Sequence, residues 1–344
     1  MSNDRRAIKI QKKKKKRKKW LLWILTPLMI IALSGIGYGA YLYTKAEAVV
    51  SKSYKPLERT STKRTKEVHP KMDNITVLFA GIDDSEARNF NNASRTDALM
   101  LATFNEKQKS VKLLSIPRDS YVYIPSKGYE DKINHAYGKG GITSTIETVE
   151  ELLDIPVDYY VKMNFEAFID VVDALGGINA EVPYELFEKD SRDRHNAIHL
   201  QEGYQKLNGE EALALARTRH YDSDIERGKR QQQIIKSIMS KASSAKSVTK
   251  YADVIEAVGE NMETDLSFDE MKSFVDYAAA GTNLNVETLS LKGSDSKING
   301  IYYYQLDEPN LEVVKSALKS QLEIGTTEDS SNANSLDTEG NTPS

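Results

Sequence analysis

An uninterrupted apolar run near the N-terminus is the strongest hydropathy feature of the chain. From Trp20 to Thr44 no residue carries a formal charge, and about 20 apolar residues are enough for a helix to cross the hydrocarbon core. The run predicts one transmembrane helix over residues 20–44. A cleaved signal peptide is the alternative, but the run exceeds the apolar region of about 7–15 residues that such peptides have, and no clear small-x-small cleavage site precedes the next charges.

Between residues 73 and 324, short apolar runs alternate with helical patterns. Helix starts are indicated by Ser144 with Glu147, by Asn164, by Asn208, and by Ser267 with Glu270. Gly176 and Gly177 are expected to end the helix that follows Asn164. Runs typical of strands lie at residues 75–81, 98–104, 111–116, 159–163 and 178–182. Interleaved strands and helices predict an α/β fold with a layered sheet.

Polar segments flank this block. Residues 45–72 lack apolar periodicity and are interpreted as a stalk, and the acidic segment 325–344 is predicted to be a disordered tail. Residues 1–19 carry eleven of the 47 Lys and Arg residues, which leaves 36 basic against 49 acidic residues in the remainder. By the positive-inside rule the basic tail is cytoplasmic and the domain at 73–324 is extracytoplasmic. We therefore expect a single-pass type II protein of the cell membrane.

The basic tract at residues 12–19 also permits a nucleic-acid role. Next to an apolar span the topology signal is the stronger interpretation, because each Lys or Arg contributes about 1 kcal/mol against anionic lipid. We therefore expect a membrane and no nucleic acid as partner. The chain has no cysteine, which excludes disulfides, thiolate metal sites and thiol nucleophiles.

Arginines and aspartates follow or precede the predicted strands, where open α/β sheets gather ligands. Asp83 and Asp84 follow the first strand, Arg95 and Asp97 precede the second, and Arg118 and Asp119 follow the third after Pro117. Surface residues of these types often form no more than solvated ion pairs. Their repeated position at strand ends nevertheless favours a shared site.

A second cluster is denser and extends over residues 216–233. Arg217 and Arg219 are two residues apart, so they face one target only if the chain is extended there. Asp222 and Asp224 precede a predicted helix whose first turns hold Arg227, Arg230 and Gln231. Cations at a helix N-terminus oppose the macrodipole unless an anion binds. A solvated charged face is the structural alternative.

Several arginines with a few aspartates have a specific chemical use. Neighbouring carboxylates repel unless a cation lies between them, and Mg²⁺ is commonly held by one or two carboxylates plus phosphate oxygens. Arginine forks bind the remaining phosphate charge bidentately. The combination indicates Mg²⁺-assisted phosphoryl transfer or pyrophosphate chemistry.

These stretches resemble the LytR-CpsA-Psr family of bacterial cell-envelope enzymes. The resemblance spans residues 75–238 with motifs in the family's order, and INGIYYY at 298–304 resembles the end of its teichoic-acid transferases. The matching stretches are GID (81–83), SRTDALML (94–101), LLSIPRDSYV (113–122), DKINHAYGKGG (131–141), VKMNFEAFIDVVDALGGINAEVP (161–183) and LNGEEALALARTRHYDSDIERGKRQQQ (207–233).

The resemblance implies a layered α-β-α domain with a central mixed sheet. It implies a phosphotransferase that moves an anionic glycopolymer from an undecaprenyl-diphosphate carrier to the C6 hydroxyl of N-acetylmuramic acid in peptidoglycan. Carried over residue by residue, it implies Mg²⁺ ligands at Asp83 and Asp97, and a catalytic or diphosphate-binding set formed by Arg95, Arg118, Lys132, Arg217, Arg219, Asp224, Arg227 and Gln231.

Two other functions fit the same sequence. A polyprenyl-diphosphate pyrophosphatase would use the same site with water as acceptor. A membrane-bound regulator or scaffold would use the basic tail, but this leaves the arginines of the domain unexplained. The family's NAAYAYGG reads NHAYGKGG here, which places His135 and Lys139 in positions to which the resemblance assigns no role.

Overall fold

A computed structural model of the chain describes residues 33–59, 61, 63, 64, 66–82, 95–218, 224–242, 250–274, 277 and 285–325. The chain divides into two compact units, Met1–Ala48 and Val49–Ser344. Residues 33–53 form a helix. Among the described residues no helix has the length and apolar character to span a membrane, and residues 20–32 of the predicted span lie outside them.

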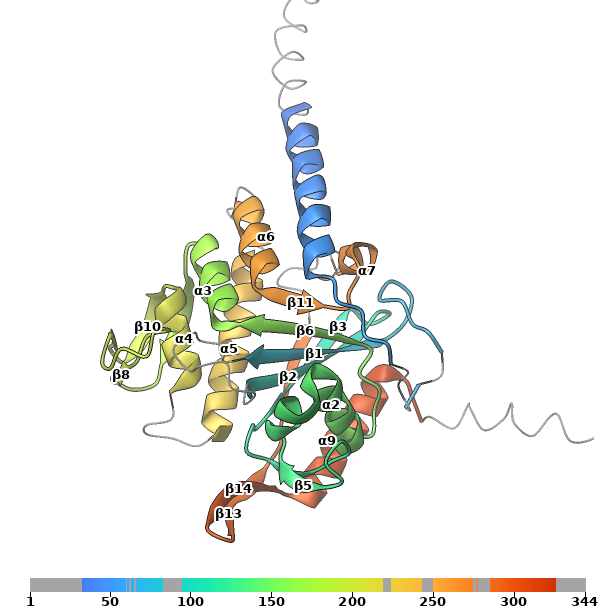
Figure 1. Cartoon of the computed structure of the whole chain (residues 1–344). Helices are drawn as coiled ribbons and strands as arrows, with labels where there is room; N and C mark the ends of the chain where they lie inside the picture. Colours follow the sequence, from blue (N-terminus) through green and yellow to red (C-terminus); the bar gives the residue numbers. More distant parts are fainter. Residues whose placement is uncertain are drawn as a thin grey trace, which may run out of the picture. The chain divides into compact units, whose positions relative to one another are not determined.

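The larger unit is built on a six-stranded mixed sheet (Figure 1). Its strand order is β11-β6-β1-β2-β3-β12, with parallel pairing of β1 with β6 and of β3 with β12, and antiparallel pairing elsewhere. The predicted α/β fold with a central mixed sheet is therefore confirmed. The strands are β1 (Ile75–Ile82), β2 (Thr96–Asn105), β3 (Ser110–Ile116), β6 (Tyr159–Asn164), β11 (Met262–Thr264) and β12 (Asn285–Ser290).

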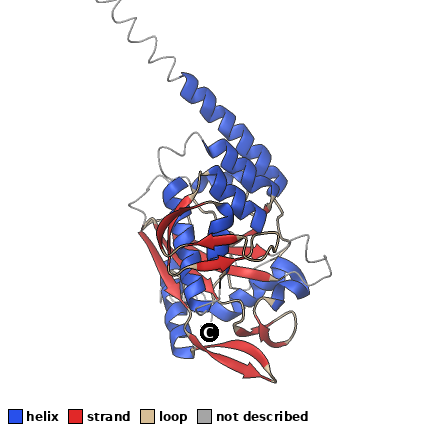
Figure 2. Cartoon of the chain, turned by 90° about the vertical axis from the view of Figure 1, so that its left-hand side faces the viewer, coloured by secondary structure: helices blue, strands red, loops and turns tan. Residues whose placement is uncertain are grey.

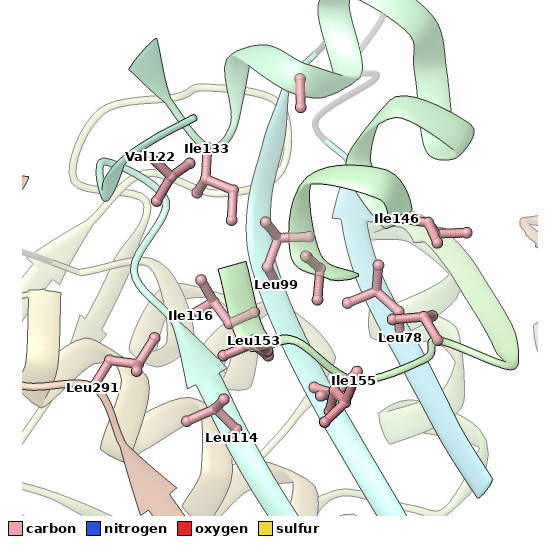
Figure 3. Packing of buried hydrophobic residues seen from close by; sticks show 14 of the residues in the cluster. Leu78, Leu99, Leu114, Ile116, Val122, Ile133, Ile146, Leu153, Ile155 and Leu291 are labelled. Atoms are coloured by element: carbon pink, nitrogen blue, oxygen red, sulfur yellow. The ribbon is translucent and has the colours of Figure 1, made fainter. Parts of the chain in front are cut away.

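One face of this sheet is closely packed. Successive side chains of a strand alternate between the faces, so Leu99 and Leu101 of β2 point to one side and Met100 to the other. Helices α2 (His135–Leu153) and α9 (Glu308–Leu322) cover the Leu99 side and complete a continuous apolar core. Figure 3 shows leucine and isoleucine side chains of strands and helix converging in this layer.

Helices also lie on the opposite face, as the view in Figure 2 shows. Helices α3 (Phe165–Ala174) and α5 (Asp224–Ala242) contact the sheet there. Helices α4 (Gly209–Arg217) and α6 (Tyr251–Glu260) pack against α3, and α7 (Phe268–Ser273) follows β11. A second apolar cluster holds α3, α4 and α5 together with a lateral pair of small sheets. Those sheets pair β7 (Ile178–Val182) with β10 (Gly203–Leu207), and β8 (Leu186–Glu188) with β9 (Ile198–Leu200).

The predicted strand at 178–182 is present but belongs to a lateral sheet, not to the central one. Two further hairpins of the described residues lie outside the sequence prediction: β4 (Tyr121–Ile124) with β5 (Tyr129–Lys132), and β13 (Gly293–Ile298) with β14 (Ile301–Leu306). Strands β5 (YEDK) and β13 (GSDSKI) are polar, and β4 (YVYI) has only four residues, so these strands give little apolar pattern to detect; β14 (IYYYQL) is aromatic and apolar.

Three of the four predicted helix starts are confirmed. The side chain of Asn164 accepts a hydrogen bond from Ala167 N at 2.9 Å, and capping boxes form at Asn208 and Ser267. The predicted start at Ser144 is wrong, because α2 begins at His135 and kinks at Gly140 and Gly141. The Ser144 hydroxyl instead hydrogen-bonds the Ser126 hydroxyl.

The predicted stalk at 45–72 is also corrected in part. Arg59 donates to Glu150 Oε1 at 3.3 Å, Ser61 Oγ donates to the same oxygen at 2.7 Å, and Arg64 Nη1 lies 3.5 Å from Asp158 Oδ1. We call Arg59, Ser61 and Arg64 the N-terminal clasp. These residues of the predicted stalk are therefore attached to the domain. Their polar side chains find partners in the buried carboxylates of Glu150 and Asp158.

Candidate active site

One edge of the central sheet collects polar residues from several strands. The parallel strands β1 and β6 end there at Ile82 and Asn164, and β3 ends nearby at Ile116. The antiparallel strand β2 starts at this edge, since Thr96 pairs with Ile82. The sheet therefore brings Asp97 at the start of β2 close to Arg118, which follows β3, as the strand-end positions predicted.

Arg118 is held between two carboxylates. Its Nη1 forms an ion pair with Asp97 Oδ1, and its Nε lies 3.6 Å from Asp119 Oδ2. The second Asp119 oxygen accepts a hydrogen bond from Lys132 Nζ at 2.8 Å. Asp119 is buried, whereas the Arg118 side chain retains 20% exposure. The paired guanidinium is thus fixed in direction but still accessible to an anion.

Lys132 has a second set of neighbours on the β13–β14 hairpin. Its Nζ lies 5.5 Å and 5.6 Å from the ring centroids of Tyr302 and Tyr303. Strand β14 is anchored to the same turn, because Tyr304 N donates to Asp119 O at 2.9 Å. The INGIYYY segment therefore supports the position of Lys132 beside Asp119 by cation-π contact.

Arg217 ends α4 and reaches the site from a different direction. Its guanidinium lies 4.7 Å from the Phe165 ring centroid, and Nη2 is 4.0 Å from Asp193 Oδ1. Thr218 leaves the helix with φ −58° and ψ 140°, so the chain is extended at the residue that follows Arg217. Arg219 lies outside the described residues.

Helix α5 contributes both structural and accessible groups. Arg230 is buried and donates to the carbonyls of Leu215 at 3.1 Å and Thr218 at 2.6 Å, so it caps the end of α4. Gln231 Nε2 donates to Ala216 O at 3.3 Å. Arg227 is buried in the protein and lines the cavity described next.

A large cavity occupies the sheet face opposite α2 and α9. Its volume is about 1330 Å³, and most lining side chains are apolar residues of the sheet, α3 and α5. Asp97, Arg118, Arg217, Arg227 and Gln231 are the polar members that the sequence predicted. Protein interiors normally have packing without such voids, so an apolar hollow of this size indicates a ligand. The cavity can hold a long apolar chain, with an anion at its arginines.

The remaining predicted site residues have different positions. Lys132 and Arg95 do not line the cavity. Lys132 is linked through Asp119 to Arg118, which does line it, and Arg95 is exposed before β2. Asp224 is the first residue of α5, and its side chain is outside the described part. Asp83 also lies outside the described residues.

The structure gives His135 a structural place. His135 Nδ1 lies 2.9 Å from Asp131 Oδ2, and Lys127 Nζ lies 2.7 Å from the same oxygen. Burial opposes ionisation of Asp131, but the hydrogen bonds from Lys127 and His135 outweigh it and lower the pKa of Asp131 to about 2. His135 therefore helps to fix the turn before α2, and Lys139 is exposed on that helix.

The donor set near the cavity is compatible with Mg²⁺. Within the described part of the chain no three acidic or histidine side chains converge on one point. Mg²⁺ does not need such a cluster, because it is commonly held by one or two carboxylates with phosphate oxygens and water. Asp97 lines the cavity with 23% of its side chain exposed, which suits one such ligand.

Sequence reasoning missed three contributors to this geometry. Asp119 was placed after its strand without a role, although it joins Arg118 to Lys132. Phe165 supports the Arg217 guanidinium, and Asp193 lies near it. The motif SIPRD already placed Asp119 next to Arg118, but no signal in the sequence links Asp193 to Arg217.

Comparisons with known proteins agree with this arrangement. The sequence profile of the LytR_cpsA_psr family matches residues 40–320. The polyisoprenyl-teichoic acid–peptidoglycan teichoic acid transferase TagT of Bacillus subtilis is 39% identical over 319 residues, covering 91% of this chain and 98% of the relative. The corresponding transferase TagU of Bacillus subtilis is 40% identical, covering 94% of this chain and 100% of the relative.

Solved structures of relatives have the same fold. A structure of TagT bound to LIIa-WTA matches with a TM-score of 0.66 and 39% identity, covering 79% of this chain and 100% of that chain. A LytR-CPS2A-psr family protein, TagT, with bound octaprenyl pyrophosphate lipid matches with a TM-score of 0.62 and 37% identity over the same shares.

Proposed function

Since this chain belongs to the LytR-CpsA-Psr family, we propose that it transfers an anionic glycopolymer such as wall teichoic acid from a polyprenyl-diphosphate carrier to peptidoglycan. The observation that carries the proposal is the apolar cavity with arginines at one part of its wall. An apolar chain and a diphosphate are the two parts of a lipid-linked donor. Relatives named as teichoic acid transferases, and a TagT structure with octaprenyl pyrophosphate, support this substrate class.

The proposed reaction is a phosphoryl transfer. The C6 hydroxyl of N-acetylmuramic acid attacks the phosphorus next to the polymer and releases its proton to water. The bond from this phosphorus to the bridging oxygen breaks, and undecaprenyl phosphate leaves with that oxygen. No nucleotide is required, because the bond that breaks is already part of the lipid-linked donor.

Arg118 and Arg217 are proposed to bind the diphosphate oxygens and to stabilise charge on the leaving phosphate. Asp119 orients Arg118, and Phe165 supports Arg217. Arg95, Lys132, Arg219, Arg227 and Gln231 complete the proposed diphosphate-binding set, and Asp224 is proposed as a catalytic neighbour. Asp83 and Asp97 are proposed to hold Mg²⁺, which would neutralise phosphate charge when bound.

We also propose that the chain is anchored in the cell membrane with its domain outside the cytoplasm. The lysine-rich run before the apolar segment 20–44 supports this topology. Anchoring would raise the effective concentration of the enzyme near a donor that is confined to the bilayer. Protease treatment of intact protoplasts should digest the domain, and protection of the domain would contradict this topology.

The decisive experiment combines the purified chain with a defined polyprenyl-diphosphate donor and peptidoglycan oligomers, with Mg²⁺ present or chelated. We expect polymer attached to peptidoglycan, loss of attachment on chelation, and abolished transfer with near-native folding in Asp97→Ala. The matched control is Asp253→Ala, which removes an exposed carboxylate on α6. Full transfer by Asp97→Ala that is insensitive to chelation would show that the metal assignment is wrong.

The same assay separates the alternative hydrolytic function. A pyrophosphatase would release polymer phosphate and undecaprenyl phosphate into solution at the same rate with or without peptidoglycan. A transferase requires the acceptor for rapid turnover, because the hydroxyl of the sugar replaces water as nucleophile. Release that does not depend on peptidoglycan, with no polymer attached to it, would overturn the proposed transfer.

A further inference from the structure

Helix α5 has two different long faces. Ile234, Ile235 and Ile238 line the apolar cavity. Lys229, Lys236 and Lys241 line a second, open groove of about 750 Å³ along the helix. The lysines are seven and five residues apart, so together with the glutamines and serines between them they form one stripe at helical spacing. Over twelve residues this stripe is about 18 Å long.

The other residues that line the groove come from strands. They are Asn179 of β7, Tyr204 of β10 and Thr288 of β12. Every described residue that lines the groove carries a polar side-chain group, and none of them is acidic. Lys229 Nζ forms an ion pair with Glu226 Oε1 at 2.6 Å, and both side chains are about half exposed. Such exposed pairs are weak, so a phosphate can replace the carboxylate.

We propose that this groove is a subsite for the polyanionic part of the donor, the phosphodiester chain of the glycopolymer. The inference rests on the proposed function and adds a location for the polymer. Its lysines match the regularly spaced negative charge of a polyphosphodiester, and its amide and hydroxyl side chains match the hydroxyl groups of sugar or polyol units. The apolar cavity and the groove then receive the two chemically opposite ends of one donor along α5.

The position of the groove supports this occupant. Lys229 is two residues from Arg227 and Gln231, which line the cavity. Lys236 and Ser240 contribute to both the cavity and the groove, so the two hollows share part of their wall. A polymer that leaves the arginines can therefore continue along α5. An anionic membrane surface is the less suitable partner, because Tyr204 is the only large apolar side chain among the described residues of the groove, and these residues offer no further apolar group to insert among lipids.

The test compares two lipid-linked donors in the full-length protein. One donor carries only the linkage sugars, and the other carries the same sugars followed by several phosphodiester repeats. We expect Lys229→Gln/Lys241→Gln to raise KM for the long donor about fivefold at low salt, since two exposed charge contacts are removed. Lys229→Glu/Lys241→Glu should have a larger effect. KM for the short donor and kcat for both donors should remain unchanged, and high salt should remove the difference by screening.

The matched control is Lys107→Gln/Lys297→Gln, which removes the same charge from exposed lysines that do not line the groove. Equal KM for the long donor in the control and in the groove variants would overturn the proposal. An equal rise for both donors would also overturn it, because the effect would then not depend on the polymer. Reduced binding to phosphatidylglycerol vesicles without any effect of polymer length would assign the lysines to the membrane instead. Failure of the wild type to transfer even the short donor would reject the proposed function, separately from this subsite.

Discussion

The two ends of the central sheet use arginine and carboxylate side chains for different purposes. At the clasp end, Arg59 is bonded to Glu150 and Val157 O, and the Glu150 side chain is only 5% exposed. At the other end, Arg118 pairs with Asp97 and Asp119 but lines a cavity of about 1330 Å³. Composition alone does not distinguish these ends, because both consist of the same residue types.

The two ends differ in whether their charged groups remain accessible to a ligand. Glu150 accepts hydrogen bonds from Arg59, from Ser61 and from Val157 N, so the protein itself satisfies this buried group. Arg118 has carboxylates around its Nε and Nη1, and Asp97 beside it is also partly exposed. We therefore expect substitutions at the clasp to change the free energy of unfolding, and substitutions at the cavity to change transfer.

The largest expected effect is the loss of stability in Glu150→Ala. The substitution leaves the Arg59 guanidinium, with 13% of its side chain exposed, without its carboxylate partner. Breaking a buried pair from one side costs about 3–5 kcal/mol. Urea unfolding of the purified protein should show this decrease, whereas turnover per folded molecule should stay near that of the wild type.

Glu151→Ala is the matched control, since Glu151 is the exposed neighbour on the same helix. Its free energy of unfolding should change by no more than about 0.5 kcal/mol. If Glu150→Ala were as stable as this control but deficient in transfer, the contrast between the two ends of the sheet would be wrong.

A second prediction concerns the pH dependence of stability at the clasp end. Burial raises the pKa of Asp265 to about 6, although a hydrogen bond from Tyr160 N and the charge of Arg59 oppose the rise. The folded state thus binds a proton more tightly than the unfolded state, whose carboxyl has a pKa of 3.8. This contribution to stability is complete below pH 3.8 and is lost as the pH rises through about 6, a decrease of about 3 kcal/mol.

Asp265→Asn should remove that decrease, because the amide stays neutral and its oxygen can still accept from Tyr160 N. The measurement is the free energy of unfolding of wild type and variant at pH 4.5 and pH 7.5, with Asp253→Asn as the exposed control. An identical pH dependence in wild type and Asp265→Asn would show that Asp265 has an ordinary pKa.

The parts of this fold that depend only on residues close together in the chain, such as helix starts, could be predicted from the sequence. Asn164 and Ser267 start helices as predicted, since a capping side chain needs only a backbone N–H three residues ahead. Ser144 does not start a helix, because Gly140 and Gly141 permit a kink inside α2 and the Ser144 hydroxyl is hydrogen-bonded to that of Ser126. Short apolar runs predicted β1, β2, β3 and β6 but not the outer strands β11 and β12, and such runs contain no information about which strands become neighbours.

The candidate site shows the same limit. Strand-end positions correctly placed Asp97 and Arg118 at one sheet edge, because the direction of each strand determines where its end lies. The cavity could not be predicted, since apolar residues that line a hollow have the same pattern as those that fill a core. The clasp was assigned to a stalk because Arg59 and Arg64 find their carboxylates about 90 residues further along the chain.

The smallest expected effect, and the most direct comparison of the two ends, comes from replacing arginine by lysine at each. Arg118→Lys keeps the charge but loses the planar fork that binds a diphosphate bidentately. Loss of one charge-assisted hydrogen bond should cost about 1.5–3 kcal/mol, so donor affinity or transfer should fall roughly 10- to 150-fold with little change in melting temperature.

Arg59→Lys should give the reverse pattern, because its partners, Glu150 and Val157 O, belong to the protein itself. Both variants are measured for donor binding, turnover and thermal unfolding. If Arg118→Lys had unchanged affinity and turnover but a large drop in melting temperature, Arg118 would be part of the structural framework, and the cavity arginines would have to be treated like those of the clasp.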